Sequence, residues 1–568
     1  MDRSRLERVP EARADGIGSN NWVVSSSKSA SGKPIVANDP HLDARILPGV
    51  WYPCGIITPD FGAVGVIIPG IPGMVIGRSS HVAMGVTNAY GDCQDLYVET
   101  VDPQDPSRYM EGTASVPFHI ITETLKIRDK EAPNGYRTEE LRIRFTRRGP
   151  VVSGVLPGLG SHRVITLRWA ASETMEPSIG LEAALTAKSV ADLRTALKSL
   201  NFIVLNWVFA DSAGNTGWHV SGKLPIRSQK DSTLPYRVRD GSDNWVGWIP
   251  FHEMPHAENP ARGWIGTCNH KTTAADYPYY FSSYFSPSYR YRRLKELLDA
   301  PGSSSAVEHW QYARDTMNVM ARTIAPVMAR ALLSGEDTRE MGRILEKWDF
   351  RDEPDTAAPT IFQLVYRNFV RSVLDANLGA EIASLVLGEG YFWEERFQRM
   401  VERGSSPWLE KALKARNASS MDDLFRRVGS ETAQELSALL GKDPASWLWG
   451  NAHTLQFVHP LRRNGVGMSL LGAGPYPMGG SRETLYCAWY DFNNPFSVVL
   501  SASLRMVADL GDEEKVMAVI PGGVSGRTLD AHMKDQIPPY MDGTPVYWWF
   551  SDQAIRTHGK HVLPLVPK

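Results

Sequence analysis

Residues 18–42, "GSNNWVVSSSKSASGKPIVANDPHL", decide the fold. Two short runs, "NNWVV" and "KPIVAND", alternate apolar and polar residues, and a Ser- and Gly-rich turn separates them. Alternation of this kind predicts two half-buried strands joined by a turn. Ser19 stands at the seam between a charged leader and the first strand. The question is why a serine occupies this position.

The remaining sequence divides by its periodicity into four parts. Residues 1–18 are charged and predict a spacer or propeptide tail. Residues 19–290 are strand-rich, at a spacing of roughly ten residues that favours antiparallel sheets, with one predicted helix at 178–200. Residues 291–445 carry amphipathic helical patterns, including a capping box at Ser305 and Glu308. Strand patterns return in 446–568. We therefore predict an α+β sheet core split by a helical insertion.

Composition excludes several classes of protein. The 568 residues carry a formal net charge of −2, so no basic surplus favours nucleic acid or an anionic membrane. The four cysteines are scattered, without the spacing of a zinc site. The longest apolar run, 62–77, is broken by Pro and Gly and is too short to span a membrane. The leader has eight charged residues between Asp2 and Asp15, which excludes a secretory signal. We expect a soluble globular chain.

A serine at a new N-terminus would carry its own base. A free α-amino group has a pKa of about 7.7–8.0, against about 10.4 for lysine, so near neutral pH it can accept the hydroxyl proton. No Gly-x-Ser-x-Gly motif supplies another serine nucleophile. Cleavage between Gly18 and Ser19 would create such a catalyst. The ordinary alternative is a serine that only begins a strand.

Several ordered motifs identify the chain as similar to a known family. The strings are "GSNNWVVS", "NDPHL", "PGIPGMVIGRSSHVAMGVTNAYGDCQDLYVE", "GWIGTCNHK", "PSYRYRRLKELL", "GPYPMGGSRETLY" and "SLRMVADLGD" with "VIPGGVSG". Together they resemble the β chain of the penicillin acylase family, amidohydrolases of the N-terminal nucleophile (Ntn) hydrolase superfamily. The resemblance covers nearly all of 19–568. It implies a four-layer αββα sandwich and an α chain from the same precursor, with which the β chain forms an αβ heterodimer.

The resemblance assigns roles to residues near the seam. It implies a zymogen that cleaves itself between Gly18 and Ser19, after which Ser19 is the nucleophile and forms an acyl-enzyme. Asn20 would help hold the new amine, or is a turn asparagine. His41 would hydrogen-bond the nucleophile or orient the attacking water, or is an ordinary satisfied polar group.

The family match also implies the groups that stabilise the oxyanion. The backbone N–H of Asn88 and the side-chain amide of Asn269 would donate to it. Arg290 would orient Asn269 or meet a polar end of the substrate, although Arg292 and Arg293 leave the register open. Glu483 lies where some cephalosporin-type acylases pair a glutamate with their histidine; the alternative is a surface ion pair.

A calcium site is the only cofactor that the resemblance implies, and the chemistry requires none. Asp92, the Gln94 carbonyl and Asp95 match part of the family's calcium pattern. The later aspartate ligand would fall in "YYFSSYF" (279–285), which has none, and a glutamate ligand would lie in the α chain. Calcium needs six or more oxygen ligands. A pair of turn aspartates is the alternative.

These observations predict an amidohydrolase. Its substrate would be a β-lactam antibiotic's side-chain amide, an N-acyl homoserine lactone or another acyl amide, and family habit places such enzymes in the periplasm or outside the cell. Two alternatives stay open at this stage. One is an unprocessed, catalytically silent relative that serves as a binding or structural subunit; the other is a metal-dependent amidase.

Overall fold

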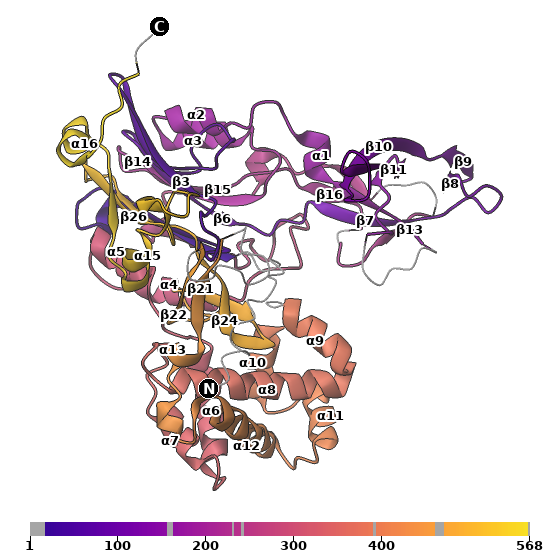
Figure 1. The fold of residues 1–568 in the computed structure, drawn as a ribbon, viewed down its shortest axis with the longest axis vertical. Coiled ribbons are helices and arrows are strands. Elements are labelled where there is room, and N and C mark those ends of the chain that lie inside the picture. The colour runs from indigo at the N-terminus through magenta and orange to yellow at the C-terminus, as the bar shows by residue number, and fades with distance from the viewer. Residues whose placement is uncertain are drawn as a thin grey trace.

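The fold comes from a computed structural model, which describes residues 18–155, 163–229, 232–239, 244–389, 393–459 and 471–565. Within these ranges two large sheets lie together in the upper half of Figure 1, and a helical unit lies below them. Residues 1–17 lie outside these ranges, so the predicted spacer stays a prediction.

The larger sheet has ten strands and carries the stretch that opened the sequence. The predicted pair of strands is present: β1 runs antiparallel to β2, with Ser19 opposite Pro40. The strands are β1 (Gly18–Val24), β2 (Ile35–Leu42), β20 (Trp264–Thr267), β21 (Thr454–Phe457), β22 (Ala473–Pro477), β23 (Ala488–Asp491), β24 (Asn494–Ala502), β25 (Arg505–Asp509), β26 (Lys515–Val519) and β27 (Val546–Trp549). Strand β2 also pairs with β24 and β25, which brings the two strand-rich parts of the sequence into one sheet.

The second sheet has seven strands in the order β19-β15-β14-β6-β5-β4-β3. They are β3 (Tyr52–Thr58), β4 (Phe61–Ile67), β5 (Ile76–Ser79), β6 (Val82–Asn88), β14 (Leu205–Asp211), β15 (Thr216–Val220) and β19 (His256–Glu258). Every pairing between them is antiparallel, as the spacing of the predicted strands indicates.

Alternating side chains along β1 serve two different cores. Val23 joins Val36 and the strands of the second sheet in one apolar cluster, whereas Trp22 and Val24 enter another cluster with Leu294. Successive side chains of a strand point to opposite faces, so β1 is buried on both sides. A strand with this environment is held rigidly, which suits a residue that must be positioned accurately.

Helices pack on both sheets. α2 (Leu181–Thr186) and α3 (Val190–Leu197) contact the second sheet, while α4 (Tyr289–Asp299), α5 (Ala306–Tyr312) and α15 (Ile537–Asp542) contribute to the other core of the first. The single helix predicted over 178–200 is two helices. Ser189 accepts a hydrogen bond from the Asp192 N–H and caps α3, which starts a new helix instead of continuing the first.

The helical unit has its own apolar core. Its helices are α6 (Ala321–Leu333), α7 (Arg339–Glu346), α8 (Ala358–Leu378), α9 (Ala380–Glu389), α10 (Glu394–Arg403), α11 (Pro407–Ala415), α12 (Met421–Leu440) and α13 (Trp449–Ala452). The predicted capping box forms at the start of α5, where Ser305 and Glu308 exchange hydrogen bonds with each other's backbone.

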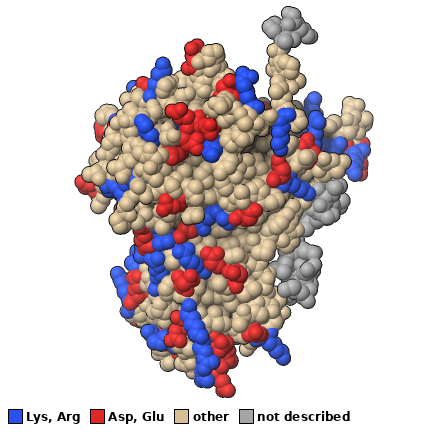
Figure 2. Space-filling view, turned by 90° about the vertical axis from the view of Figure 1, so that its left-hand side faces the viewer, with Lys and Arg blue, Asp and Glu red and all other residues tan. Residues whose placement is uncertain are grey.

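Short sheets and turns complete the described chain. The short strands are β7 (Gln94–Glu99), β8 (Arg108–Glu111), β9 (Ala114–Pro117), β10 (His119–Arg128), β11 (Tyr136–Thr146), β12 (Gly149–Pro150), β13 (Val164–Trp169), β16 (Pro225–Arg227), β17 (Tyr236–Arg237) and β18 (Trp245–Trp248); the remaining α-helices are α1 (Ala170–Thr174) and α16 (Asp552–His558). Within the described ranges, no helix has the length and apolarity needed to cross a membrane. On the face shown in Figure 2, basic and acidic side chains are interspersed.

Candidate active site

Ser19 lies at the start of β1, buried and hydrogen-bonded through three of its groups. Its backbone N–H donates to Asn269 Oδ1 at 2.6 Å, and its carbonyl accepts from Arg290 Nη1 at 2.7 Å. Its hydroxyl contacts the carbonyl oxygen of Gly18. The hydroxyl therefore faces the peptide bond at which cleavage is predicted.

Asn269 is fixed at both ends of its amide. Oδ1 accepts from Ser19 N–H and from Arg290 Nη2 at 2.9 Å, and Nδ2 donates to the Asn88 carbonyl at 2.8 Å. Its backbone is in the left-handed region, at φ 62°, where a residue other than glycine is strained. Strain of this kind clusters at functional sites. The predicted oxyanion groups Asn88 and Asn269 are in contact, but through the Asn88 carbonyl; the role of its N–H stays a prediction.

Of Arg290, Arg292 and Arg293, Arg290 is the one whose guanidinium contacts Ser19. From the first turn of α4 its Nη1 reaches Ser19 O and Asn20 Oδ1, the latter at 2.6 Å. Arg293 instead pairs with Asp315 on a different side of the helix. The Arg290 guanidinium therefore fixes the orientation of two amide side chains around the serine.

Asn20 has other partners than the one expected. Its Nδ2 donates to the Leu485 carbonyl at 3.0 Å and lies 3.4 Å from His41 Nε2, while its Oδ1 accepts from Arg290. The Asn20 side chain forms no hydrogen bond with the Ser19 nitrogen, which donates to Asn269 instead. Asn20 thus ties β1 to the 481–485 loop and to α4.

His41 is buried and pairs with a carboxylate two residues away. Its Nε2 lies 3.2 Å from Asp39 Oδ2, and within the described part of the chain its Nδ1 has no hydrogen-bond partner. Burial opposes the charged form, but the neighbouring Cys487 thiol and the Asp39 carboxylate outweigh it and raise the pKa of His41 above its ordinary value. The Asp39 carboxylate fixes the orientation of the ring through Nε2, which suits a positioning role.

The expected pair of His41 with Glu483 is not formed, and this expectation is corrected. The Glu483 carboxylate accepts from Ser481 Oγ at 2.9 Å, and Asp39 is the acid beside the histidine. Next to Glu483, Arg482 forms a fully buried ion pair with Glu394 of α10 at 2.7 Å. Glu483 thus belongs to a buried cluster against the helical unit, and burial raises its pKa.

Two of the predicted calcium ligands, Asp92 and Asp95, form ion pairs with Arg227. Arg227 Nε donates to Asp95 Oδ2 at 2.9 Å, and Nη2 lies 3.2 Å from Asp92 Oδ1. Trp245 Nε1 also donates to Asp95, and the Gln94 backbone N–H donates to Asp92. The described residues contain no group of three or more His, Cys, Asp or Glu that could hold a metal ion. With Arg227 in this position, the residues do not fit a calcium ion.

Sequence reasoning missed two contributors to the site. Asp39 lies two residues before His41 in a predicted strand, and this spacing, which places both on one face, was the available signal. Glu395 of α10 is the other: it accepts from both the N–H and the hydroxyl of Ser288, the residue before α4. No sequence signal links residues 288 and 395. Through Ser288, the helical unit anchors the end of α4 that carries Arg290.

A family model described as "Penicillin amidase" matches residues 1–557. The acyl-homoserine lactone acylase QuiP of Pseudomonas aeruginosa is 27% identical to this chain, over 97% of this chain and 69% of that protein. Penicillin acylase 2 proenzyme of Pseudomonas sp. (strain SE83) is 28% identical, over 98% of this chain and 70% of that protein.

A solved structure has the same fold. The thermostable penicillin G acylase from Alcaligenes faecalis matches with a TM-score of 0.73 at 18% identity, over 97% of this chain and 99% of that chain. The mixed α+β fold is therefore shared. The chain thus spans nearly all of one chain in a solved structure, but only about 70% of the curated proenzyme.

Proposed function

We propose that this chain, which belongs to the penicillin amidase family of Ntn hydrolases, cleaves acyl amides with Ser19 as an N-terminal nucleophile. Membership makes it an amidohydrolase of the penicillin acylase and homoserine lactone acylase type. The observation that carries the finer proposal is the set of contacts around Ser19. Its N–H, carbonyl and hydroxyl are held by Asn269, Arg290 and Gly18, so that one residue presents both the nucleophile and its prospective base.

The first proposed step is self-cleavage. Ser19 Oγ attacks the Gly18 carbonyl carbon, the Gly18–Ser19 C–N bond breaks as an ester forms, and the Ser19 nitrogen takes the hydroxyl proton. Water then hydrolyses the ester, which releases the Gly18 carboxylate and restores the hydroxyl. Asn269 Oδ1 already accepts from the nitrogen that would become the amine. The residues before Ser19 would otherwise keep that nitrogen as an amide, which is not basic.

The proposed catalytic cycle uses this free amine as the base. Ser19 Oγ attacks the substrate carbonyl while the amine accepts its proton, and the oxyanion receives hydrogen bonds from Asn269 Nδ2 and the Asn88 N–H. The intermediate collapses to an acyl-enzyme, and the departing amine leaves with the proton. Water, deprotonated by the Ser19 amine, then releases the acid. Each oriented donor contributes about 3–4 kcal/mol to the transition state. His41, held by Asp39, orients the groups around the hydroxyl.

The proposed scaffold is the four-layer αββα sandwich, with an α chain of the same precursor as partner in an αβ heterodimer. The order helix, sheet, sheet, helix in the apolar clusters supports the first part. The share of the proenzyme that this chain spans supports the second. We propose the divisions at 18, 290 and 445 as its domain boundaries in the sequence, with α4 and α5 after residue 290 packed on the first sheet. We also propose a periplasmic or secreted enzyme that needs no calcium.

Intact mass and N-terminal sequencing of the purified protein test the proposal. We expect a chain that begins at Ser19 and hydrolyses acyl amides. Ser19→Ala would stay uncleaved and inactive, whereas the matched control Ser27→Ala, at an exposed serine beyond β1, would behave as wild type. A panel of acyl chain lengths and leaving groups, including homoserine lactone and β-lactam amides, would then define the substrate.

The two alternatives give different results in the same experiment. An intact Met1 terminus after prolonged incubation, with any α partner present, would favour a catalytically silent subunit. Turnover that survives Ser19→Ala but is abolished by a chelator would favour a metal-dependent amidase.

A further inference from the structure

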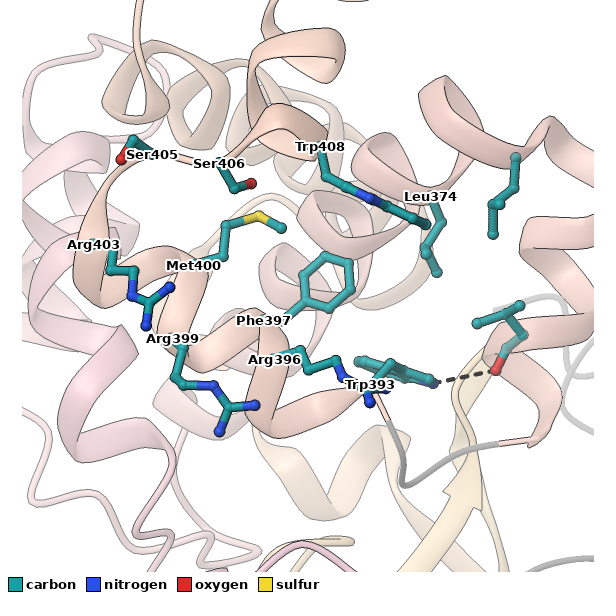
Figure 3. Close-up of a pocket in the computed structure, with 12 residues that line it drawn as sticks. Leu374, Trp393, Arg396, Phe397, Arg399, Met400, Arg403, Ser405, Ser406 and Trp408 are labelled. Carbon is teal, nitrogen blue, oxygen red and sulfur yellow. Dashed lines mark hydrogen bonds between the residues drawn. The ribbon is translucent and has the colours of Figure 1, made fainter. Parts of the chain in front are cut away.

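An apolar pocket with a basic mouth lies in the helical unit, away from the residues of the Ser19 site. Its volume is about 520 Å³, within the range of about 300–1,000 Å³ of small-molecule sites. In Figure 3, Phe397 and Met400 of α10 project towards Leu374 of α8 and Trp408 of α11. Trp393 closes one side. The depth of the pocket therefore offers hydrocarbon-like surface.

Arginines of α10 follow the edge of this pocket. Arg396, Arg399 and Arg403 line it at a spacing that places them along one side of the helix (Figure 3). Arg399 and Arg403 are exposed. Among the described residues, neither of them forms an ion pair. The exposed hydroxyl of Ser405 lies at the same mouth.

Unpaired arginines are unusual in this part of the molecule. Most other arginines of the helical unit lie within 4 Å of a carboxylate, among them Arg330, Arg343, Arg367, Arg416, Arg426 and Arg427; within the described ranges, Arg339 at the start of α7 does not. The carboxylates on α10 itself are engaged elsewhere, because Glu394 pairs with Arg482, Glu395 accepts from Ser288, and Glu402 accepts from Gln398. Among the described residues, no carboxylate therefore lies within 4 Å of the Arg399 or Arg403 guanidinium, and both can accept an incoming anion.

We propose that this pocket binds a long-chain carboxylate. The hydrocarbon chain would lie against Phe397, Met400 and Trp408, and the carboxylate would accept hydrogen bonds from Arg399 and Arg403. Guanidinium groups bind carboxylates through charge-assisted, often bidentate hydrogen bonds. The acid released from a long-chain acyl amide belongs to this class, but the site shares no residue with the Ser19 site. Binding is therefore independent of the proposed function.

Calorimetric titration with decanoate, below the concentration at which it forms micelles, tests the site. The protein would carry Ser19→Ala, so that no turnover contributes. We expect one saturable site, no binding of acetate and weaker binding of 1-decanol, which has the chain without the charge. Arg399→Gln/Arg403→Gln should weaken decanoate binding at least tenfold. The control Arg330→Gln/Arg343→Gln removes two exposed arginines of the same unit and should leave it unchanged.

A second variant tests the apolar part. Met400→Trp fills the pocket and should abolish decanoate binding while thermal unfolding shows an intact fold. If Arg399→Gln/Arg403→Gln bound decanoate as tightly as the control Arg330→Gln/Arg343→Gln, the proposal would be overturned. The ligand would then occupy another site. Absence of decanoate binding to the protein with its intact pocket would overturn it as well, and would point to a partner chain covering this face.

Discussion

At the scale of single residues, the oxygen and the nitrogen of the Asn269 side-chain amide have different proposed roles. Its oxygen holds the Ser19 nitrogen and its nitrogen is the proposed oxyanion donor. We predict that Asn269→Gly lowers the turnover number about 10²–10³-fold, the usual loss when one oxyanion donor is removed. Glycine is the suitable replacement, because it adopts φ 62° without strain. Steady-state kinetics with a chromogenic acyl amide would measure the loss.

The Asn269→Gly protein must also be shown to fold and to be cleaved. Unfolding temperature and cleavage before Ser19, measured on the same preparation, separate a catalytic loss from a structural one. Unchanged turnover in a folded, cleaved Asn269→Gly protein would show that Asn269 is not an oxyanion donor.

The sequence predicted several side chains that the structure brings together, but not all of their partners. Ser19, Asn269 and Arg290 meet as the family resemblance implied. The acid beside His41 is Asp39 and not Glu483, because two residues on one face of a strand are neighbours whatever the rest of the fold does. Arg227, by contrast, reaches Asp95 across 132 positions of sequence, and no local pattern encodes that contact.

At the scale of secondary-structure elements, Arg227 at the end of β16 holds the start of β7 through Asp92 and Asp95. We predict that Arg227→Met lowers the free energy of unfolding by about 3–5 kcal/mol, because it leaves a buried carboxylate without its partner. Denaturant unfolding would measure the change. Arg237→Met, at an exposed arginine of β17, is the control and should be close to neutral.

Denaturant unfolding in the presence of a chelator tests whether calcium stabilises the protein. Because the guanidinium occupies the position that a cation would need, chelator should not change the unfolding of the wild-type protein. A chelator-dependent loss of stability, or stabilisation of wild type by added calcium, would contradict this assignment.

Elements with a strong local signal were predicted well. α5 begins at the capping box that the spacing of Ser305 and Glu308 predicts. The helix predicted over 178–200 was wrong in one respect, because a run of helix-forming residues hides a break. The hydrogen bond from the Asp192 N–H to the Ser189 side chain, seen only in the structure, shows where α3 begins.

At the scale of the whole molecule, buried acids lie where the helical unit meets the sheets. Burial raises the pKa of Asp352 to about 8, and Asn318 Nδ2 donates to its Oδ2 at 3.0 Å. In the unfolded chain an aspartate has a pKa of about 3.9. The folded protein therefore binds the proton more tightly, so this contribution to stability is fully present below pH of about 4 and is lost as the pH rises through about 8.

We predict that Asp352→Asn removes this dependence. The amide keeps an acceptor for Asn318 and carries no charge, so the variant should gain stability relative to wild type as the pH rises from about 5 to about 8.5. Unfolding temperature measured across that range would show the effect. Asp349→Asn, at a nearby exposed aspartate, should give a curve parallel to wild type; parallel curves for both variants would disprove the assignment.

The joining of distant strands into one sheet is the part of the architecture that periodicity could not supply. Alternation predicted strands at both ends of the sequence, but strand order is set by which edges pair. Residues 35–42 pair with β1 along one edge and with β24 and β25 in succession along the other, because apolar faces from both regions share one core. Such a choice depends on long-range packing, for which a single sequence carries no local signal.

The contact between Glu395 and Ser288 bears on how this enzyme could be shortened. Helical insertions in a sheet core invite deletion by a protein engineer who wants a smaller catalyst. Here α10 supplies the carboxylate that binds Ser288, the residue before α4, and the first turn of α4 directs Arg290 at Ser19. A trimmed chain could keep every residue of the reaction and still lose the alignment of its serine. A minimal version would have to replace that carboxylate from the sheet side.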